Sequence, residues 1–335
     1  MSILITGGAG FIGSATARLC AHAGRRVTIL DNLSTGRMDH VRWGAFCLGD
    51  IRDVPTVREV LRVNGITTVV HLAAHANVGE SIADPAQYYS NNVAGTTALL
   101  DAMLAENVRR VVFASSCSVY GNTASLRLRE DHDVHPVSPY GETKMICERM
   151  LDWYGRAYGL QAVTLRYFNV AGADSEAGLG EDIETSQRII PRTLHAALHN
   201  VPLRIFGTDF DTADGTAVRD YVHVCDVAGA NLRAIEYLEE GRPNAVMNLG
   251  SGCGVSVRQI GATVSQTLGR ALQTQENPRR EGDVPYAVAD ATRAEELLGW
   301  RAASSSLSGI VNSAVMYCHR LLEDPCRPEH DILAM

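Results

Sequence analysis

The chain has 335 residues, enough for one large domain or two, and its 46% hydrophobic and 20% charged residues exclude a disordered protein. With 30 basic and 38 acidic residues the net charge is −8, which argues against nucleic acid or an anionic membrane as a partner. The eight cysteines form no C-x-x-C pair, no signal peptide is visible, and no apolar run approaches the ~18 residues that span a bilayer. We therefore expect a cytoplasmic protein with reduced cysteines.

The N-terminus has the pattern of a dinucleotide site. A short apolar strand is followed by glycines spaced G-x-x-G-x-x-G, at Gly7, Gly10 and Gly13. Glycine permits positive φ and close approach of a pyrophosphate, and the N-terminus of the helix that follows favours an anion. A second strand over Arg26–Leu30 ends in Asp31, where an acidic residue binds ribose hydroxyls. The charge of Asp31 would repel a 2′-phosphate, so NAD is favoured over NADP, although the nearby Arg37 counts against this preference.

More strand and helix patterns alternate along the first half of the chain. Strands are predicted over 44–48, 67–72, 110–114 and 161–165, and helices over 86–106 and 140–157. Such alternation is typical of a parallel sheet covered on both faces, which binds ligands beyond the carboxyl ends of its strands. The sequence therefore predicts an α/β fold with a Rossmann-type doubly wound parallel sheet.

The regular alternation ends near residue 170. Beyond it a strand is predicted over 219–224, a helix over 228–239, a strand over 245–249 and a helix near 291–298. We predict an NAD-binding Rossmann domain made of residues 1–168 and 221–249. A smaller, non-contiguous α/β substrate domain is predicted to comprise residues 169–220 and 250–335.

The segment from Ser138 to Lys144 carries the strongest catalytic pattern. Ser138 and Pro139 are a helix entry signal, so Tyr140 and Lys144 are expected on one face of the first helical turns. Free tyrosine titrates near ~10, and a positive charge ~4 Å away lowers that pKa toward neutrality. The pattern alone is common on helix surfaces; beside a dinucleotide site it predicts a tyrosine base.

With these motifs the chain resembles the extended short-chain dehydrogenase/reductase family and, within it, the UDP-glucose 4-epimerase family. The likeness runs from Ile3 to about Trp300. Its most specific parts are 6–13 (TGGAGFIG), 78–81 (VGES), 91–96 (NNVAGT), 115–121 (SSCSVYG), 166–169 (RYFN), 214–224 (DGTAVRDYVHV) and 280–283 (REGD).

The resemblance implies three sets of site residues, each matched by position. The catalytic set would be Ser116, Tyr140 and Lys144. NAD would be lined by Gly7, Gly10, Phe11, Ile12, Gly13, Asp31, Asn32, Asp50, Ile51, Leu72, Ala73, Ala74, Asn92, Tyr140, Lys144 and Phe168. The nucleotide sugar would be held by Ser116, Tyr140, Asn169, Arg188, Arg219, Arg280, Asp283 and Ala287.

The implied reaction is the NAD-dependent inversion of a sugar C4, with UDP-glucose and UDP-galactose as the first-choice pair. Tyr140 as phenolate would take the 4-hydroxyl proton while hydride passes to nicotinamide, and Lys144 would lower the pKa of Tyr140. Arg219 and Arg280 would grip the diphosphate so that the sugar can turn over. The small Ala287 implies room for a 2-acetamido group. A homodimer is expected from the resemblance alone.

Two departures from the family leave the sugar open. Ala76 stands where some epimerases carry a lysine, and Arg188 stands where Asn or His is usual. A C4-epimerase of an N-acetylhexosamine, uronate or heptose nucleotide is therefore the alternative enzyme. A dehydratase is disfavoured because Cys117 and Ser118 replace its Asp-Glu pair. A non-catalytic NAD-binding regulator is the alternative of another class, and it has no need of the retained tyrosine base.

No metal site is predicted. His195 and His199 form an i,i+4 pair in an expected helix, but no Glu or Cys partner is apparent nearby. Cys117 follows Ser116 and is expected to be a small packing residue.

Overall fold

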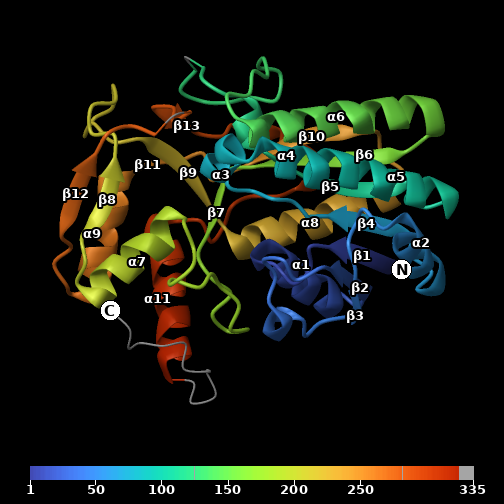
Figure 1. The fold of residues 1–335 in the computed structure, drawn as a ribbon, viewed down its shortest axis with the longest axis horizontal. Coiled ribbons are helices and arrows are strands. Elements are labelled where there is room, and N and C mark those ends of the chain that lie inside the picture. The colour runs from blue at the N-terminus through green and yellow to red at the C-terminus, as the bar shows by residue number, and fades with distance from the viewer. Residues whose placement is uncertain (124, 281, 324–335) are drawn as a thin grey trace.

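The computed structural model describes residues 1–123, 125–280 and 282–323 (Figure 1). Seven strands form one parallel sheet in the order β10-β6-β5-β4-β1-β2-β3. They are β1 (Ser2–Thr6), β2 (Arg26–Asp31), β3 (Ala45–Leu48), β4 (Thr68–His71), β5 (Arg110–Ser116), β6 (Gln161–Tyr167) and β10 (Ala245–Leu249). The strand order reverses between β1 and β4, which places a ligand crevice at the carboxyl ends of these two strands. The predicted Rossmann-type sheet is confirmed.

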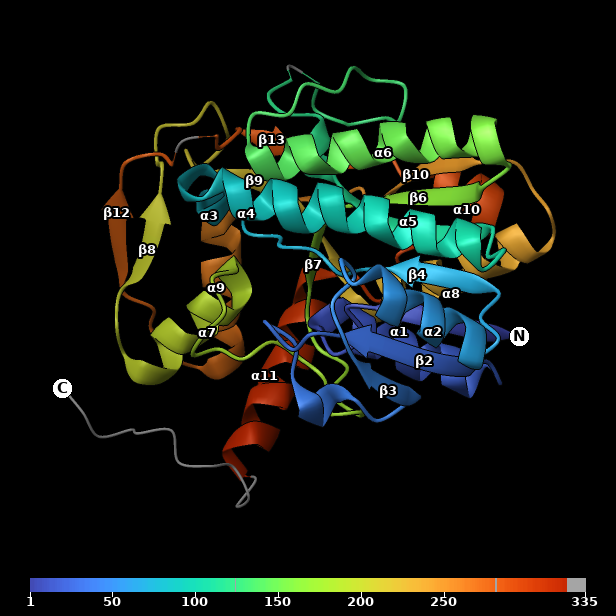
Figure 2. The same cartoon turned by 45° about the vertical axis from the view of Figure 1, so that its right-hand side comes forward.

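Helices cover both faces of this sheet (Figures 1 and 2). One face is packed by α1 (Phe11–His22), α8 (Val224–Glu239) and α10 (Thr292–Leu298). The other face is packed by α2 (Val54–Val63), α5 (Gly95–Ala105) and α6 (Pro139–Tyr158). The alternation of side chains along a strand explains this arrangement, since Ile3 and Ile5 enter the first core and Leu4 enters the second. A strand buried on both faces therefore reads as a continuous apolar run.

The predicted helix over 86–106 is confirmed as one helical run from residue 85 to 105, and it contains a π-helical segment that the sequence did not indicate. After α3 (Val78–Ala83) the chain forms α4 (Pro85–Tyr88), a π-helical segment η2 (Tyr89–Ala94) and then α5. Asn92 lies buried within the π-helical segment, where its Nδ2 donates to Thr143 Oγ1 of α6 at 3.1 Å. A segment of this kind is rare and often marks a functional site.

A smaller α/β unit lies at one end of the large sheet (Figure 2). In it β9 (Val218–His223) pairs with β7 (Asn169–Ala171), β11 (Gly254–Ser256) and β13 (Tyr286–Ala287), and β8 (Leu203–Phe206) pairs with β12 (Thr274–Asn277). The helices α7 (Ile189–His199), α9 (Val257–Leu268) and α11 (Leu307–Glu323) enclose its core, which includes Ile190, Leu194, Tyr221, Ile260 and Ile310. The sequence patterns predicted β9 but missed β8, β12, α9 and α11.

The proposed domain boundaries stay a prediction, and their last residues, 324–335, lie outside the described residues. The chain passes between the two units within a few residues: β9 belongs to the smaller sheet, whereas α8, which follows it directly, covers the large sheet. Within the described part of the chain, no helix is both long and apolar enough to cross a membrane.

Candidate active site

The turn between β1 and α1 is shaped to receive a diphosphate. Gly7 has φ +71°, and a Cβ on it would lie 2.7 Å from the backbone N of Ala73. A Cβ on Gly13 would lie 2.1 Å from the carbonyl oxygen of Gly7, so both positions require glycine. Gly10 is the N-cap of α1, whose first residue is Phe11, and the free N–H groups of this helix end favour an anion.

Asp31, at the end of β2, is placed to bind a ribose while it holds the glycine turn. Its Oδ2 accepts from the Ala9 backbone N at 2.9 Å, and its Oδ1 accepts from the Leu33 N at 2.8 Å. Each carboxylate oxygen keeps a second lone pair for a ligand hydroxyl. Arg37 pairs with Asp39 (Nη2–Oδ2, 2.7 Å) and Asp182 (Nη1–Oδ2, 3.5 Å), and these contacts hold it with acids instead of leaving it free for a 2′-phosphate.

A second set of polar groups orders the loops after β3 and β4. Asp50 Oδ2 accepts from Asn32 Nδ2 at 3.0 Å and from Arg52 Nη2 at 2.7 Å, and the Arg52 hydrogen bond lowers the pKa of Asp50 despite partial burial. Asn92 accepts from the His75 N at 2.9 Å and donates to the His75 O at 3.0 Å. In this structure Asn92 therefore braces the loop after β4, and its predicted contact with NAD stays a prediction.

Twelve of the predicted cofactor residues lie at or just beyond the carboxyl ends of β1 to β4, along one edge of the sheet. They are Gly7, Gly10, Phe11, Ile12, Gly13, Asp31, Asn32, Asp50, Ile51, Leu72, Ala73 and Ala74.

Tyr140 and Lys144 lie on one buried face of α6, as their spacing predicts. Ser138 is the N-cap, its Oγ accepting from the Gly141 N at 3.2 Å, and Pro139 is the first helical residue. The hydroxyl of Ser116, at the end of β5, acts on the Tyr140 side chain and lowers its pKa. The same Oγ donates to Ser118 Oγ and accepts from the Ser118 N, each at 3.1 Å. The Lys144 Nζ lies 5.9 Å from the centroid of the Tyr140 ring. The structure thus brings the three predicted catalytic residues together.

The expected lowering of the Tyr140 pKa by Lys144 is not what the structure shows. Burial raises the pKa of Tyr140, while the hydrogen bond with Ser116 and the charge of Arg188 oppose the rise. The Lys144 Nζ instead donates to the Ala114 carbonyl oxygen at 2.8 Å, and burial lowers the pKa of Lys144 to about 8. The physical reason is that Lys144 and Tyr140 share one dry environment, which disfavours the charged form of each.

Two of the predicted substrate arginines flank a carboxylate on the smaller unit. Arg219 Nη2 lies 3.7 Å from Asp283 Oδ1, and the guanidinium of Arg280 stacks 3.8 Å from the centroid of the Phe206 ring. Burial raises the pKa of Asp283, and the positive charges of Arg219 and Arg280 partly offset this rise. Both arginines thus share one carboxylate, an arrangement that leaves net positive charge for an anionic ligand. Glu281 of the same motif lies outside the described residues.

Arg188 faces the glycine turn from the smaller unit. It is the N-cap residue of α7, its guanidinium lies 5.7 Å from the centroid of the Phe11 ring, and its Nη1 donates to the Val170 carbonyl oxygen at 3.4 Å. Its Nε lies 3.5 Å from Glu181 Oε1, and this nearby cation opposes the rise that burial causes in the pKa of Glu181. Arg188 therefore lies against protein groups at the mouth of the site.

Ala287 lies where the two units meet. It pairs in register with Arg219 across β13 and β9, so both side chains leave the same face of the small sheet. It packs in one apolar cluster with Phe168, which follows β6 of the large sheet. Asn169 starts β7 and hydrogen-bonds with Tyr221. The predicted cofactor and substrate residues thus meet at this junction.

Comparison with known proteins assigns the chain to a family. Residues 3–250 match the NAD dependent epimerase/dehydratase family. The chain belongs to this family. It is 44% identical over 314 residues to the UDP-glucose 4-epimerase of Rhizobium meliloti (strain 1021), covering 93% of this chain and 95% of that protein. The predicted family is therefore confirmed.

Solved structures give the same result. The UDP-glucose 4-epimerase of Brucella ovis in complex with NAD superposes with a TM-score of 0.90 at 44% identity, covering 93% of this chain and 97% of that one. The UDP-Glc/GlcNAc 4-epimerase of Campylobacter jejuni superposes with a TM-score of 0.83 at 33% identity, covering 95% of this chain and 99% of that one.

Sequence reasoning missed Tyr88 as part of this epimerase/dehydratase site. Its ring meets that of Tyr140 edge to face at 6.4 Å between centroids. Its hydroxyl lies 2.7 Å from both the Asn77 carbonyl oxygen and Glu80 Oε2. The signal was present, because Glu80 belongs to the VGES motif, but the partner of that glutamate could not be read from local spacing.

The expectation that His195 and His199 lack an acidic partner is wrong. His195 Nε2 lies 3.3 Å from Glu184 Oε2, and His199 Nε2 lies 3.1 Å from Glu184 Oε1. Glu184 precedes α7 on a loop that folds back over the helix, so the contact depends on tertiary structure. Cys117 is half-buried against an apolar cluster, and burial raises its pKa to about 11, which agrees with its predicted packing role.

Proposed function

We propose that this protein catalyses the reversible inversion of C4 in UDP-glucose and UDP-galactose through a 4-keto sugar. The observation that carries the proposal is the placement of Tyr140 and Lys144 on one buried face of α6, with Ser116 of β5 acting on the Tyr140 side chain. This group lies at the carboxyl edge of the sheet that also bears the glycine turn. The names of the relatives support the same reaction.

The glycine turn and Asp31 have the chemistry that binding of NAD requires. A side chain at Gly7 or Gly13 would collide with the backbone of Ala73 or of Gly7 and would distort the turn that we propose receives the diphosphate, and Asp31 keeps spare lone pairs for a ribose hydroxyl. Bound NAD would supply a reversible hydride acceptor for sugar C4. Because the same reaction returns the hydride, the cofactor is not consumed, and tight retention of NAD is compatible with turnover.

Tyr140 is the group that moves the proton. As phenolate it takes the proton of the 4-hydroxyl when C4 is oxidised, and as phenol it gives that proton back when C4 is reduced. Ser116 would donate a hydrogen bond to the same sugar oxygen, and its hydroxyl lowers the pKa of Tyr140. The Lys144 Nζ lies 5.9 Å from the centroid of the tyrosine ring, and its ammonium group would be the one to bind the cofactor ribose.

The substrate is anchored by its diphosphate and not by its sugar. Arg219 and Arg280 supply the guanidinium groups, whose planar forks fit phosphate oxygens. Arg188 adds a third cation from the N-terminus of α7. An anchor at the nucleotide leaves the 4-keto sugar free to present its other face.

A second substrate class is supported by Ala287. This side chain has no atoms beyond Cβ, and it lies beside Phe168 where the two units meet. We therefore propose that UDP-N-acetylhexosamines are accepted too, an activity that the name of the Campylobacter jejuni relative includes.

The experiment is to incubate the purified protein with UDP-galactose and no added cofactor, and to follow UDP-glucose by NMR. Conversion with more than one turnover per chain is expected. Denatured protein should release NAD and not NADP. Bound NAD without conversion of any of the three sugar classes, hexose, N-acetylhexosamine or uronate, would favour a non-catalytic regulator.

Two further proposals are a homodimer, which rests on the family resemblance, and a cytoplasmic location, which rests on the cysteine pattern of the sequence. Sedimentation velocity at micromolar concentration, with and without UDP, tests the first. A mass of one chain under both conditions would contradict it.

A further inference from the structure

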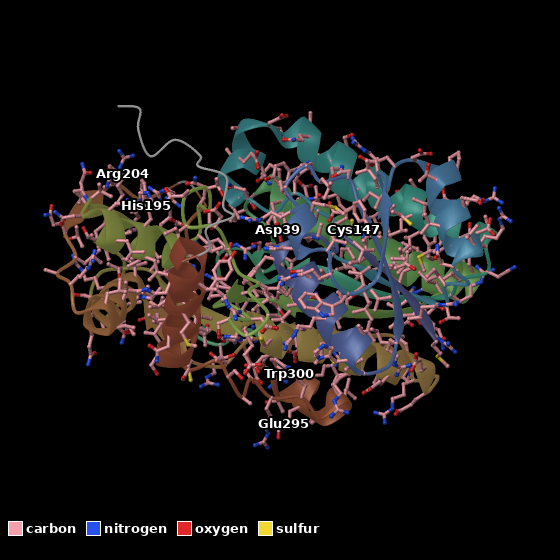
Figure 3. The ribbon with its side chains drawn as sticks, turned by 90° about the horizontal axis from the view of Figure 1, so that it is seen from below. Asp39, Cys147, His195, Arg204, Glu295 and Trp300 are labelled. Atoms are coloured by element: carbon pink, nitrogen blue, oxygen red, sulfur yellow. The ribbon has the colours of Figure 1, made fainter. Side chains whose placement is uncertain are left out.

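Three metal-ligating side chains converge on the outer face of the smaller unit. His195 and His199 are one helical turn apart on α7, and their ring centroids lie 4.5 Å apart. Glu184 reaches both rings from the preceding loop. Figure 3 shows His195 at the end of the molecule formed by the smaller unit, away from Cys147 of α6. The cluster plays no part in the reaction proposed above.

The separations match what one metal ion would require. Zn²⁺ binds His nitrogen and carboxylate oxygen at ~2.0–2.2 Å, so two ligand atoms of a tetrahedral site lie about 3.3 Å apart. The two Nε2–Oε separations are 3.3 Å and 3.1 Å, and the ligand atoms of all three residues lie within 4.8 Å of one another. Little rearrangement is therefore needed to bring the three groups around one ion.

We propose that Glu184, His195 and His199 bind one divalent transition-metal ion, with solvent completing its coordination. Two imidazoles and a carboxylate suit Zn²⁺, Co²⁺ or Ni²⁺ and not Mg²⁺ or Ca²⁺, which prefer oxygen ligands. Glu184 and His199 are each 45% exposed at their side chains, and His195 is 20% exposed, so solvent can reach the ion.

The helix gives the site its rigidity. The apolar side of α7, including Ile190 and Leu194, is buried in the core of the smaller unit. The two histidines are thus fixed relative to each other before an ion arrives, and the loop residue Glu184 is the ligand that closes on it. A bound ion would tie the loop over 184–188 to α7, and this loop ends in Arg188, which faces the glycine turn.

The simpler reading is that Glu184 only accepts hydrogen bonds from two imidazoles. A metal site and a hydrogen-bonded cluster are both consistent with these distances, but only a metal site predicts that the protein binds added metal. Arg192 on the same helix lowers the affinity of this region for cations, since its charge also bears on His195. The test must therefore measure binding directly.

The experiment uses tag-free protein as purified, with its bound nucleotide, titrated with Zn²⁺ and then Co²⁺ by calorimetry. One ion per chain is expected in the wild type. Glu184→Gln and His199→Gln should each weaken binding by at least about tenfold. His22→Gln, which removes an exposed histidine at the end of α1, should leave it unchanged. Mg²⁺ should give no heat of binding.

Two further readouts separate this site from adventitious cysteine ligation and from a folding defect. The Co²⁺ spectrum should lack thiolate charge-transfer bands. Zn²⁺ should slow tryptic cleavage after Arg188 in the wild type but not in Glu184→Gln, whose melting temperature without metal should match the wild type. Equal Zn²⁺ affinity in the wild type and both ligand variants, or no binding at all, would overturn the proposal. Neither outcome bears on the epimerase activity, which is assayed separately.

Discussion

At the scale of a single residue, the surroundings of Tyr140 favour its protonated form. Burial raises its pKa, and the hydrogen bond with Ser116 and the charge of Arg188 lower it. A buried phenol is a poor base until positive charge comes close. Oxidised NAD carries such a charge on its nicotinamide ring, so we propose that bound NAD would favour the phenolate of Tyr140.

Tyr140→Phe should reduce kcat by at least about 100-fold, because general acid–base catalysis contributes about that much or more. Binding of UDP should be unchanged, since the diphosphate anchors lie on the other unit. Steady-state rates and calorimetry with UDP measure the two effects. Tyr158→Phe, at an exposed tyrosine of the same helix, is the matched control. A Tyr140→Phe enzyme with near wild-type kcat would refute the assignment.

Asp31→Ala should lower the affinity for NAD by about 10- to 100-fold, since each hydrogen bond to a charged group contributes about 1.5–3 kcal/mol. The variant also loses the bond from the Ala9 N that holds the glycine turn. The NAD content per chain after acid release is the measurement. Asp39→Ala, which removes an exposed acid paired with Arg37, should purify with its full complement of NAD.

His40 makes stability depend on pH. It is the last residue of η1 (Met38–His40), it is 4% exposed, and among the described residues neither ring nitrogen has a hydrogen-bond partner. Burial lowers its pKa to about 4, opposed by Asp39 and aided by Arg37 and Arg42. Because the unfolded chain binds this proton below about pH 6.5 and the folded chain does not, stability falls as the pH drops from 6.5 toward 4.

Between pH 7 and pH 5 this one group should cost the wild type about 2 kcal/mol of unfolding free energy. The phenyl ring of His40→Phe needs no hydrogen-bond partner and takes up no proton. This variant should therefore lose about 2 kcal/mol less unfolding free energy between pH 7 and pH 5 than the wild type, whereas His22→Gln should lose as much as the wild type. Urea unfolding at both pH values measures the difference. Equal losses in wild type and His40→Phe would mean that His40 is protonated in the folded protein.

At the scale of elements, the start of α6 fixes the catalytic turn. Ser138 caps the helix, Pro139 starts it, and Tyr140 follows within the first turn. The carboxyl end of β5 places Ser116 opposite, and the π-helical segment η2 packs Asn92 against Thr143 of α6. The elements α6, β5 and η2 thus together determine the orientation of the Tyr140 side chain.

Ser138→Ala should lower the unfolding free energy by about 1 kcal/mol, the usual cost of a lost N-cap. It should also reduce kcat, by up to about 100-fold, because the turn that holds Tyr140 is loosened. Asp53→Ala removes the N-cap of α2, whose carboxylate accepts from the Thr56 N at 3.2 Å. Asp53→Ala should lower the unfolding free energy by a similar amount and leave kcat unchanged. An equal effect of both variants on kcat would show that helix capping has no specific role at the site.

At the scale of the whole molecule, the site exists only where the two units meet. The large sheet supplies the cofactor edge and the tyrosine, and the smaller unit supplies Arg188, Arg219, Arg280 and Ala287. Ala287 and Arg219 leave the same face of the small sheet because their strands pair in register. We therefore propose that the second unit sets the width of the sugar pocket.

Ala287→Tyr should narrow that pocket. We expect kcat/KM for UDP-N-acetylgalactosamine to fall by at least about tenfold, because a large side chain would exclude the acetamido group, while UDP-galactose is affected less. The ratio of the two kcat/KM values in wild type and variant is the measurement. Val288→Tyr, at the next residue and therefore on the opposite face of the chain, is the control. An unchanged ratio would show that Ala287 does not limit the pocket.

The sequence alone determined the features that depend on local spacing. Glycines at fixed intervals permit one kind of turn, Asp31 follows directly on an apolar strand, and Ser138-Pro139 starts a helix that puts Tyr140 and Lys144 on one face. Backbone geometry over a few residues decides all three, so they could be predicted without any long-range contact. The parallel sheet followed from the alternation of strand and helix patterns.

Tertiary structure decided what depends on partners far apart in the chain. Lys144 turns to the Ala114 carbonyl, Asn92 braces the loop after β4, and Arg188 lies over Phe11. Glu184 meets His199, 15 residues away, only because its loop folds back on α7. The direction of each side chain is set by packing among several elements. No spacing within one element encodes that packing, because its energy comes from contacts that form only after the elements have assembled.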